Sequence, residues 1–145
     1  MKLLIILAVT VLALAPARAD DHKPADKAAI EAAVWDYFHG QGEASAERLN
    51  RAFAGDHAAM VGVLKNDDGS DAIRSWKDMN EVIANWSAND NPPGGERDGE
   101  IVHMNIVDSR IATVMFRSTD RFYDALTLAK VNGQWKIIAK GFVRQ

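Results

Sequence analysis

The stretch YDALTLAKVNGQWKIIAK, residues 123–140, decides the fold expected for this chain. Apolar and polar residues alternate on both sides of Asn132-Gly133, a dipeptide typical of a two-residue hairpin turn with positive φ at both positions. The stretch therefore predicts two antiparallel strands. Counted outward from the turn without interruption, the residues on their inner side pair as Lys130 with Trp135, Leu128 with Ile137, Leu126 with Ala139, and Asp124 with Gly141.

Asp124 is the unusual residue of this hairpin, because it shares the more apolar side, which is expected to face the helices. No Lys or Arg is expected near it on that side, since Lys130 lies about 20 Å away along the strand. Burial then disfavours the charged carboxylate unless several donors converge on it. Three interpretations stay open: a structural carboxylate bonded to a Tyr or a backbone amide, a ligand-binding or acid–base group in a pocket, and a frayed strand end.

The residues before the hairpin predict three helices and one strand. The first helix begins at Pro24, ends at Gly40 and Gly42, and carries one apolar stripe. Ser45 caps a short second helix, the apolar segment 57–64 reads as a strand, and Ser75 caps a third helix. The stripe of the first helix is Ile30, Ala33, Val34, Tyr37 and Phe38, and that of the third is Trp76, Met79, Ile83 and Trp86.

After the loop signal at 89–99 the apolar period changes to two, which predicts an antiparallel meander of strands 100–107, 110–118, 122–130 and 135–142. In the first of these, Val102, Met104 and Ile106 are expected inside. For strand 110–118 two alternatives stay open. A two-residue turn at Thr119-Asp120 points Ile111, Thr113 and Met115 inward, and a longer loop points Ala112, Val114 and Phe116 inward. The order predicts an α+β fold with three helices packed on a curved, mostly antiparallel sheet and a cavity between them.

The N-terminus has the pattern of an export signal. Lys2 precedes the apolar run from Leu3 to Leu14, and Ala17-Arg18-Ala19 offers a small-x-small cleavage pattern. Residues 1–19 are therefore predicted to be a signal peptide and 20–145 a single domain, periplasmic or secreted and free of membrane after cleavage. The chain has no Cys, and its 20 Asp and Glu exceed its 17 Lys and Arg. No basic run indicates a nucleic-acid partner, and no spacing of ligating residues indicates a metal or cofactor.

The chain resembles the nuclear transport factor 2-like superfamily over residues 25–143, and within it the group called "putative lumazine-binding" proteins. The resemblance rests on YFHG (37–40), FAGDHAAMVGV (53–63) and YDALTLAKVNGQWKIIAKGF (123–142). It implies a cone-shaped fold with a pocket between helices and sheet, and pairing of two copies through the outer sheet face. The superfamily includes ketosteroid isomerase, whose catalytic base belongs on the first strand. Here Ala59, Met60 and Val61 occupy that strand, and none can accept a proton.

The function predicted is that of an exported protein that binds a small, partly aromatic molecule, without catalysis. The expected pocket residues are Tyr37, Met60, Trp76, Met79, Met104, Met115 and Asp124. One alternative is a small lyase or isomerase that uses Asp124 and Tyr37. A second is a non-catalytic dimerisation or protein-interaction domain. A homodimer is expected through an outer cluster of Tyr123, Ile138 and Phe142.

Overall fold

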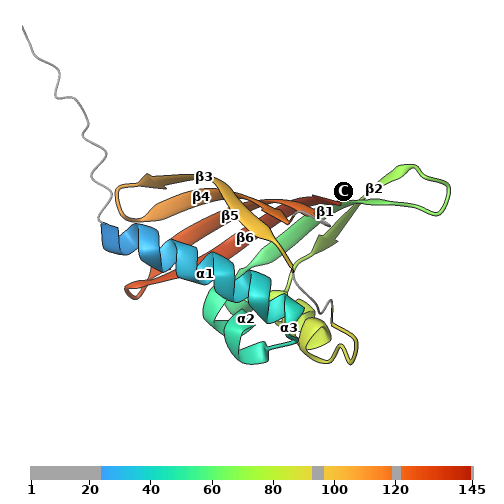
Figure 1. Ribbon diagram of the computed structural model, residues 1–145, viewed down its shortest axis with the longest axis horizontal. Coiled ribbons are helices and arrows are strands. Elements are labelled where there is room, and N and C mark those ends of the chain that lie inside the picture. The colour runs from blue at the N-terminus through green and yellow to red at the C-terminus, as the bar shows by residue number, and fades with distance from the viewer. Residues whose placement is uncertain (1–23, 93–96, 119–121, 145) are drawn as a thin grey trace, which may run out of the picture.

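The computed structural model describes residues 24–92, 97–118 and 122–144; the predicted signal peptide lies outside these ranges. Three helices lie along one face of a curved six-stranded sheet (Figure 1). The helices are α1 (Pro24–Gly42), α2 (Ala46–Ala52) and α3 (Met79–Ser87), with a short 3-10 turn η1 (Gly55–His57). The strands are β1 (Ala59–Lys65), β2 (Asp71–Trp76), β3 (Gly99–Val107), β4 (Ile111–Ser118), β5 (Phe122–Val131) and β6 (Gln134–Arg144). The predicted fold class is confirmed.

The strands are ordered β2-β1-β6-β5-β4-β3. β1 runs parallel to β6, and the other neighbouring pairs are antiparallel. α1 crosses the concave side of the sheet, and α2 and α3 lie together on the same side, next to the C-terminal half of α1 (Figure 1). No helix within the described residues is long and apolar enough to cross a membrane.

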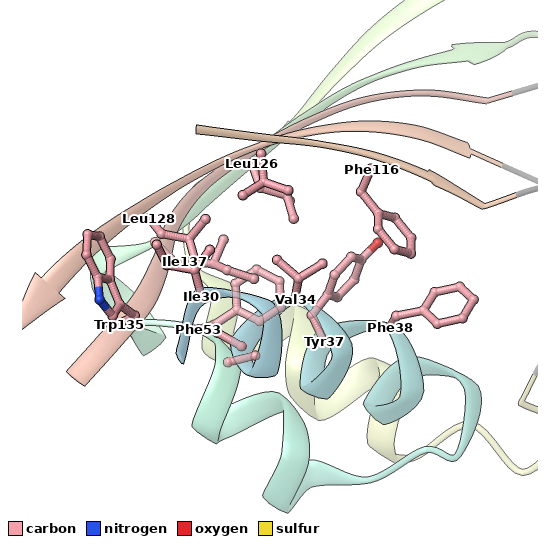
Figure 2. Close-up of a cluster of buried hydrophobic side chains, with 14 of the residues drawn as sticks. Ile30, Val34, Tyr37, Phe38, Phe53, Phe116, Leu126, Leu128, Trp135 and Ile137 are labelled. Carbon is pink, nitrogen blue, oxygen red and sulfur yellow. The ribbon is translucent and has the colours of Figure 1, made fainter. Parts of the chain in front are cut away.

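The core forms where the stripe of α1 meets the inner face of the sheet. All five residues predicted for that stripe are buried. Figure 2 shows Ile30 and Val34 packed beneath Leu126, Leu128 and Ile137. At the start of α1, the buried Asp26 accepts hydrogen bonds from Lys130 Nζ at 2.6 Å and from the indole nitrogen of Trp135 at 2.9 Å. These bonds, from Lys130 first, hold the pKa of Asp26 well below its usual range. The first turn of α1 is thereby fixed to the turn end of the β5–β6 hairpin.

The hairpin departs from the expected register at one residue. Asn132-Gly133 is a two-residue turn with φ of 50° and 80°, and Leu128 pairs with Ile137 as expected. Thr127 then pairs with Ala139, so Ile138 is an extra residue on β6, a β-bulge. Beyond it the expected partners are wrong by one: Leu126 pairs with Lys140 and Asp124 with Phe142, not with Ala139 and Gly141. The bulge turns Lys140 and Phe142 to the inner face, where both had been expected outside.

The structure also shows which residues of β4 and β3 point to the inner face of the sheet. On β4, Ala112, Val114 and Phe116 are buried, so the alternative with the longer loop is the correct one. On β3 the register shifts between Ile101 and His103, and this bulge leaves Val102 exposed, contrary to expectation. Beyond it Ile106 is buried and Met104 packs partly buried against the core, as predicted.

The third helix begins later than predicted. Trp76 ends β2, where it pairs with Met60 of β1, and does not belong to the helix. The N-cap is Asp78, whose carboxylate accepts from the backbone N–H of Asn80 at 2.8 Å, so the capping role expected of Ser75 is wrong. β2 was missed because it is a mostly exposed edge strand without an apolar period.

A glycine makes room for one of the inward residues. A Cβ on Gly62 of β1 would lie 2.1 Å from Cζ of Phe142. We expect Gly62→Ala to displace the Phe142 ring and to lower the free energy of unfolding by about 1–3 kcal/mol, measured by urea denaturation. Gly141→Ala is the matched control on β6, because its Cβ would have no neighbour closer than 3.9 Å. Equal stability of the two variants would contradict this account of Gly62.

Candidate functional site

A cavity of about 230 Å³ lies between the helices and the inner face of the sheet. Its walls come from α1, α3 and four strands of the sheet. The lining residues are Tyr37, Gln41, Met60, Leu64, Trp76, Val82, Asn85, Trp86, Phe122, Lys140 and Phe142. Engineered apolar cavities of roughly 150 Å³ hold benzene, so this one has room for a molecule of one or two rings.

Aromatic rings form much of the wall. The Phe142 ring lies 5.8 Å from that of Trp76 at 32°, and 5.5 Å from that of Phe122 in an edge-on arrangement. Tyr37 and Trp86 lie 6.1 Å apart at 33°. Rings in such arrangements offer flat apolar surfaces against which another ring can stack.

One carboxylate holds two polar lining residues in place. Asp124 of β5 is 1% exposed and accepts a hydrogen bond from the Tyr37 hydroxyl at 2.8 Å. Its other oxygen accepts from Nζ of Lys140, which β6 presents through the bulge. Figure 2 shows the Tyr37 ring rising from α1 toward the sheet. Asp124 itself does not line the cavity, so Tyr37 and Lys140 lie between it and any ligand.

Burial sets the protonation of this group. Burial, together with the charge of Asp124, raises the pKa of Tyr37 well above 10, so its hydroxyl keeps its proton at neutral pH. Burial lowers the pKa of Lys140 to about 8, against the opposing effect of Asp124. The Lys140 ammonium also lies 5.0 Å from the Tyr37 ring centre and 4.8 Å from that of Phe142, where the ring faces attract a cation.

Two of the polar side chains that line the cavity, those of Lys140 and Gln41, offer hydrogen-bond donors. An ammonium has three N–H donors. Lys140 donates one hydrogen bond to Oδ1 of Asp124, which leaves its other donors for a ligand. The carbonyl oxygen of Gln41 accepts from Arg97 at 3.3 Å. Because a guanidinium only donates, this contact leaves the amide N–H groups of Gln41 for other partners. The cavity is therefore suited to a ligand with hydrogen-bond acceptors.

The structure separates the residues expected in the pocket. Tyr37, Met60 and Trp76 line the cavity. Asp124 is inward, buried and hydrogen-bonded, as expected, but lies behind the cavity wall. Three methionines lie elsewhere: Met79 is in the core, Met104 packs at β3, and Met115 is 46% exposed on the outer face. Met115 was expected inside only in the alternative with the short turn, which is wrong.

Sequence reasoning missed Lys140, and the expectation that no cation lies near Asp124 is wrong. It also missed Phe142, because both residues lie beyond the bulge and were counted to the outer side. The one local signal was Ile137-Ile138, two consecutive large apolar residues in an otherwise alternating strand. Gln41, Asn85 and Phe122 have no pattern of their own, since only the packing of α1, α3 and β5 brings them to one cavity.

Comparison with solved structures places the fold among nuclear transport factor 2-like proteins. A protein of unknown function from Shewanella baltica matches with 22% identity and a TM-score of 0.69, over 83% of this chain and 94% of that one. Another from Methylobacillus flagellatus matches with 23% identity and a TM-score of 0.67, over 88% and 98%. A ketosteroid isomerase-like protein from Erwinia carotovora atroseptica matches with 17% identity and a TM-score of 0.57, over 84% and 98%.

The family is defined more closely by the sequence. Residues 25–143 match the family described as "Putative lumazine-binding", and the chain belongs to it. No curated protein matches the chain. The family's description supports a ligand-binding domain, in agreement with the cavity described above.

The ion pair generates a prediction for stability. Asp124→Ala leaves the Lys140 ammonium buried without its partner, and we expect a loss of about 3–5 kcal/mol in the free energy of unfolding at pH 7. Tyr37→Phe removes one hydrogen bond to a charged group and should cost about 1.5–3 kcal/mol. The double variant Asp124→Leu/Lys140→Met removes both charges and should recover most of the loss.

The control for these variants is Asp71→Ala, which removes an exposed carboxylate paired with Lys65 across β1 and β2. Exposed pairs contribute about 0–1 kcal/mol, so this variant should remain close to the parent. An Asp124→Ala variant as stable as Asp71→Ala would contradict the structural role of the buried pair.

Proposed function

We propose that the chain is an exported protein that binds a small, flat, partly apolar molecule in the cavity beside Lys140. The observation that carries the proposal is the combination of aromatic walls with the cationic side chain of Lys140 among the lining residues that the structure describes. Ligand pockets have this composition, mostly apolar with a few polar groups that fix orientation. Export rests on the signal-peptide pattern of residues 1–19.

Size and polarity narrow the class of ligand. The volume of about 230 Å³ lies below the roughly 300–1,000 Å³ of pockets for drug-sized molecules, which favours one or two rings. The free donors of Lys140 and Gln41 favour a carbonyl or another acceptor on that ring system. Lumazine, the molecule in the family's description, is a flat fused ring system with carbonyl oxygens and is the first compound to test.

The isomerase-type alternative has less support from the geometry. In that reaction a carboxyl group and a phenol act directly on the substrate. Here Tyr37 donates its hydrogen bond to Asp124, and Asp124 lies behind the cavity wall. Turnover that is lost in Asp124→Asn while ligand binding persists would favour the enzyme over the binding protein.

Binding can be read from the tryptophans. Two of the four, Trp76 and Trp86, line the cavity, and we expect lumazine to quench their emission. Trp76→Phe and Trp86→Phe should each reduce the quenching. Trp35→Phe, whose ring packs against Phe38 and Phe116 away from the lining residues, should not. At about 100 times its Kd the ligand should stabilise the fold by about 2.7 kcal/mol.

A matched pair of ligands tests the polar contact. 2-Acetylnaphthalene and 2-ethylnaphthalene have similar shape, and only the first carries an acceptor. We expect the ketone to bind on the order of tenfold more tightly, because it accepts from Lys140, and expect Lys140→Met to remove the difference.

One outcome of the tryptophan experiment would contradict the proposed site. This is quenching by lumazine that is equal in Trp35→Phe, Trp76→Phe and Trp86→Phe, with no thermal stabilisation.

We also propose that two copies pair through the outer sheet face. Phe142 no longer belongs to the outer cluster expected from the sequence, and Ile138 is half-buried at the bulge. A different exposed cluster supports the pairing: Val61, Met115, Tyr123 and Val143 are 46%, 46%, 49% and 47% exposed. Val61, Gly141, Ala125 and Met115 follow one another across β1, β6, β5 and β4 in a single row of partners. Small and apolar residues in one row make a flat surface that can pair with its own copy about a two-fold axis.

Substitution on this row tests the dimer. We expect the parent protein to elute as a dimer in size-exclusion chromatography with light scattering, and Met115→Glu to elute as a monomer, because the charge would be buried at the interface. Val131→Glu, an equally exposed apolar residue at the hairpin turn, is the control and should remain dimeric. A monomeric parent would refute the pairing.

A further inference from the structure

Among the residues that the structure describes, Lys140 is the only cationic one that lines the cavity, and its position there depends on a departure from regular structure. Without the extra residue Ile138, the alternation of β6 would direct Lys140 to the outer face. β-Bulges often re-aim a side chain at a functional site. Replacing a buried ion pair by apolar residues of similar volume is often neutral or stabilising, so stability alone gives no reason for the Lys.

The surroundings of Lys140 are those of a reactive amine. Its side chain is 4% exposed and its pKa is about 8. Within the described part of the chain, the titratable groups that face it are Asp124 from β5 and Tyr37 from α1; the other lining residues described, on α1, α3 and the strands, carry no titratable group. Desolvation in a hydrophobic pocket is one of the ways in which proteins prepare a Lys to attack a carbonyl.

We propose that Lys140 captures a flat, conjugated aldehyde as a reversible imine inside the cavity. The proposal rests on the proposed function, since the aldehyde must first bind between the aromatic walls. The walls would hold the carbonyl carbon close to Nζ, and a separation of roughly 3–3.5 Å is the near-attack geometry for such a reaction. Exclusion of water from the buried site would slow hydrolysis of the imine.

Asp124 accepts and returns the proton that this reaction requires. The ammonium of Lys140 gives one proton to the carboxylate with which it is already hydrogen-bonded. The free electron pair of nitrogen then forms the C–N bond, and the π pair of the carbonyl moves to oxygen. The oxygen takes one proton from nitrogen. Asp124 returns its proton to nitrogen through the same hydrogen bond, and nitrogen passes it to the oxygen, which leaves as water. The products are a protonated imine and water, so no oxidant or reductant is needed, and the ion pair with Asp124 is restored.

Protonation distinguishes Lys140 from the exposed lysines. A Lys with an ordinary pKa of 10.5 has a far smaller neutral fraction at pH 7 than one with a pKa of about 8, by a factor of roughly 300. Tyr37 keeps its proton at this pH and serves as a fixed donor to Asp124. The amine of Lys140 is thus the nucleophile available to a bound aldehyde near neutral pH.

The experiment uses 2-naphthaldehyde with cyanoborohydride, which reduces an imine to a stable secondary amine. The mass of the intact protein should rise by that of the aldehyde less one oxygen, and peptide mapping should place the adduct on Lys140. At pH 7 we expect at least about tenfold more adduct on Lys140 than on exposed Lys65. Labelling of Lys140 should level off above about pH 8.

Two variants and one ligand complete the design. Lys140→Arg keeps a cation that cannot form an imine and should lose the dominant adduct, whereas Lys65→Met should keep it. If Lys140→Arg does not fold, the peptide map of the unmodified sequence decides alone. 2-Naphthalenemethanol reports binding without reaction: stabilisation by the alcohol with no preference of the aldehyde for Lys140 overturns the imine and leaves the binding site standing. No stabilisation and no adduct overturns both.

Discussion

The buried ion pair between Asp124 and Lys140 is the interaction on which the arrangement of hairpin, helix and cavity depends. It joins β5 to β6, and Tyr37 connects the same carboxylate to α1. A register without the bulge would leave the Asp124 carboxylate buried and without its cation, at a cost of several kcal/mol. The buried carboxylate of Asp124 therefore depends on the extra residue Ile138, because the bulge brings Lys140 to the inner face.

A second buried carboxylate holds the other end of the same helix. Asp26 binds Lys130 and Trp135 near the hairpin turn, while Tyr37 binds Asp124 farther along the strands. The two helical residues lie roughly 16 Å apart along the axis, at 1.5 Å per residue. Between them the apolar stripe of α1 packs against the sheet. Because both contacts go to one hairpin, its register fixes where α1 lies, and α1 beyond Tyr37 closes one side of the cavity.

The features predicted from sequence are local and periodic, and those missed are not. The Asn132-Gly133 turn, the alternation of the C-terminal strands and the stripe of α1 each depend on neighbours a few residues apart. The bulge at Ile138 leaves the alternation intact on both sides but shifts the pairing and facing of the residues beyond it by one position. Lys140 and Phe142 were therefore placed on the wrong face. β2 is exposed and aperiodic, and Trp76 was assigned to the helix because Ser75 and Asp78 have the spacing of a capping box. Asp26 was missed because an Asp in the first turn of a helix is usually a solvated residue that favours the dipole.

The structural and functional interpretations of Asp124, which the sequence left as alternatives, are compatible in this geometry. The carboxylate is hydrogen-bonded and closed off from the cavity, as a structural residue would be. The two groups that it holds, Tyr37 and Lys140, are themselves part of the cavity wall. Burial raises the pKa of Tyr37, so its hydroxyl keeps its proton, whereas burial lowers the pKa of Lys140 and makes its ammonium easier to deprotonate. Any chemistry that a ligand meets here therefore acts through the amine of Lys140, and Asp124 contributes by orienting that amine and exchanging a proton with it.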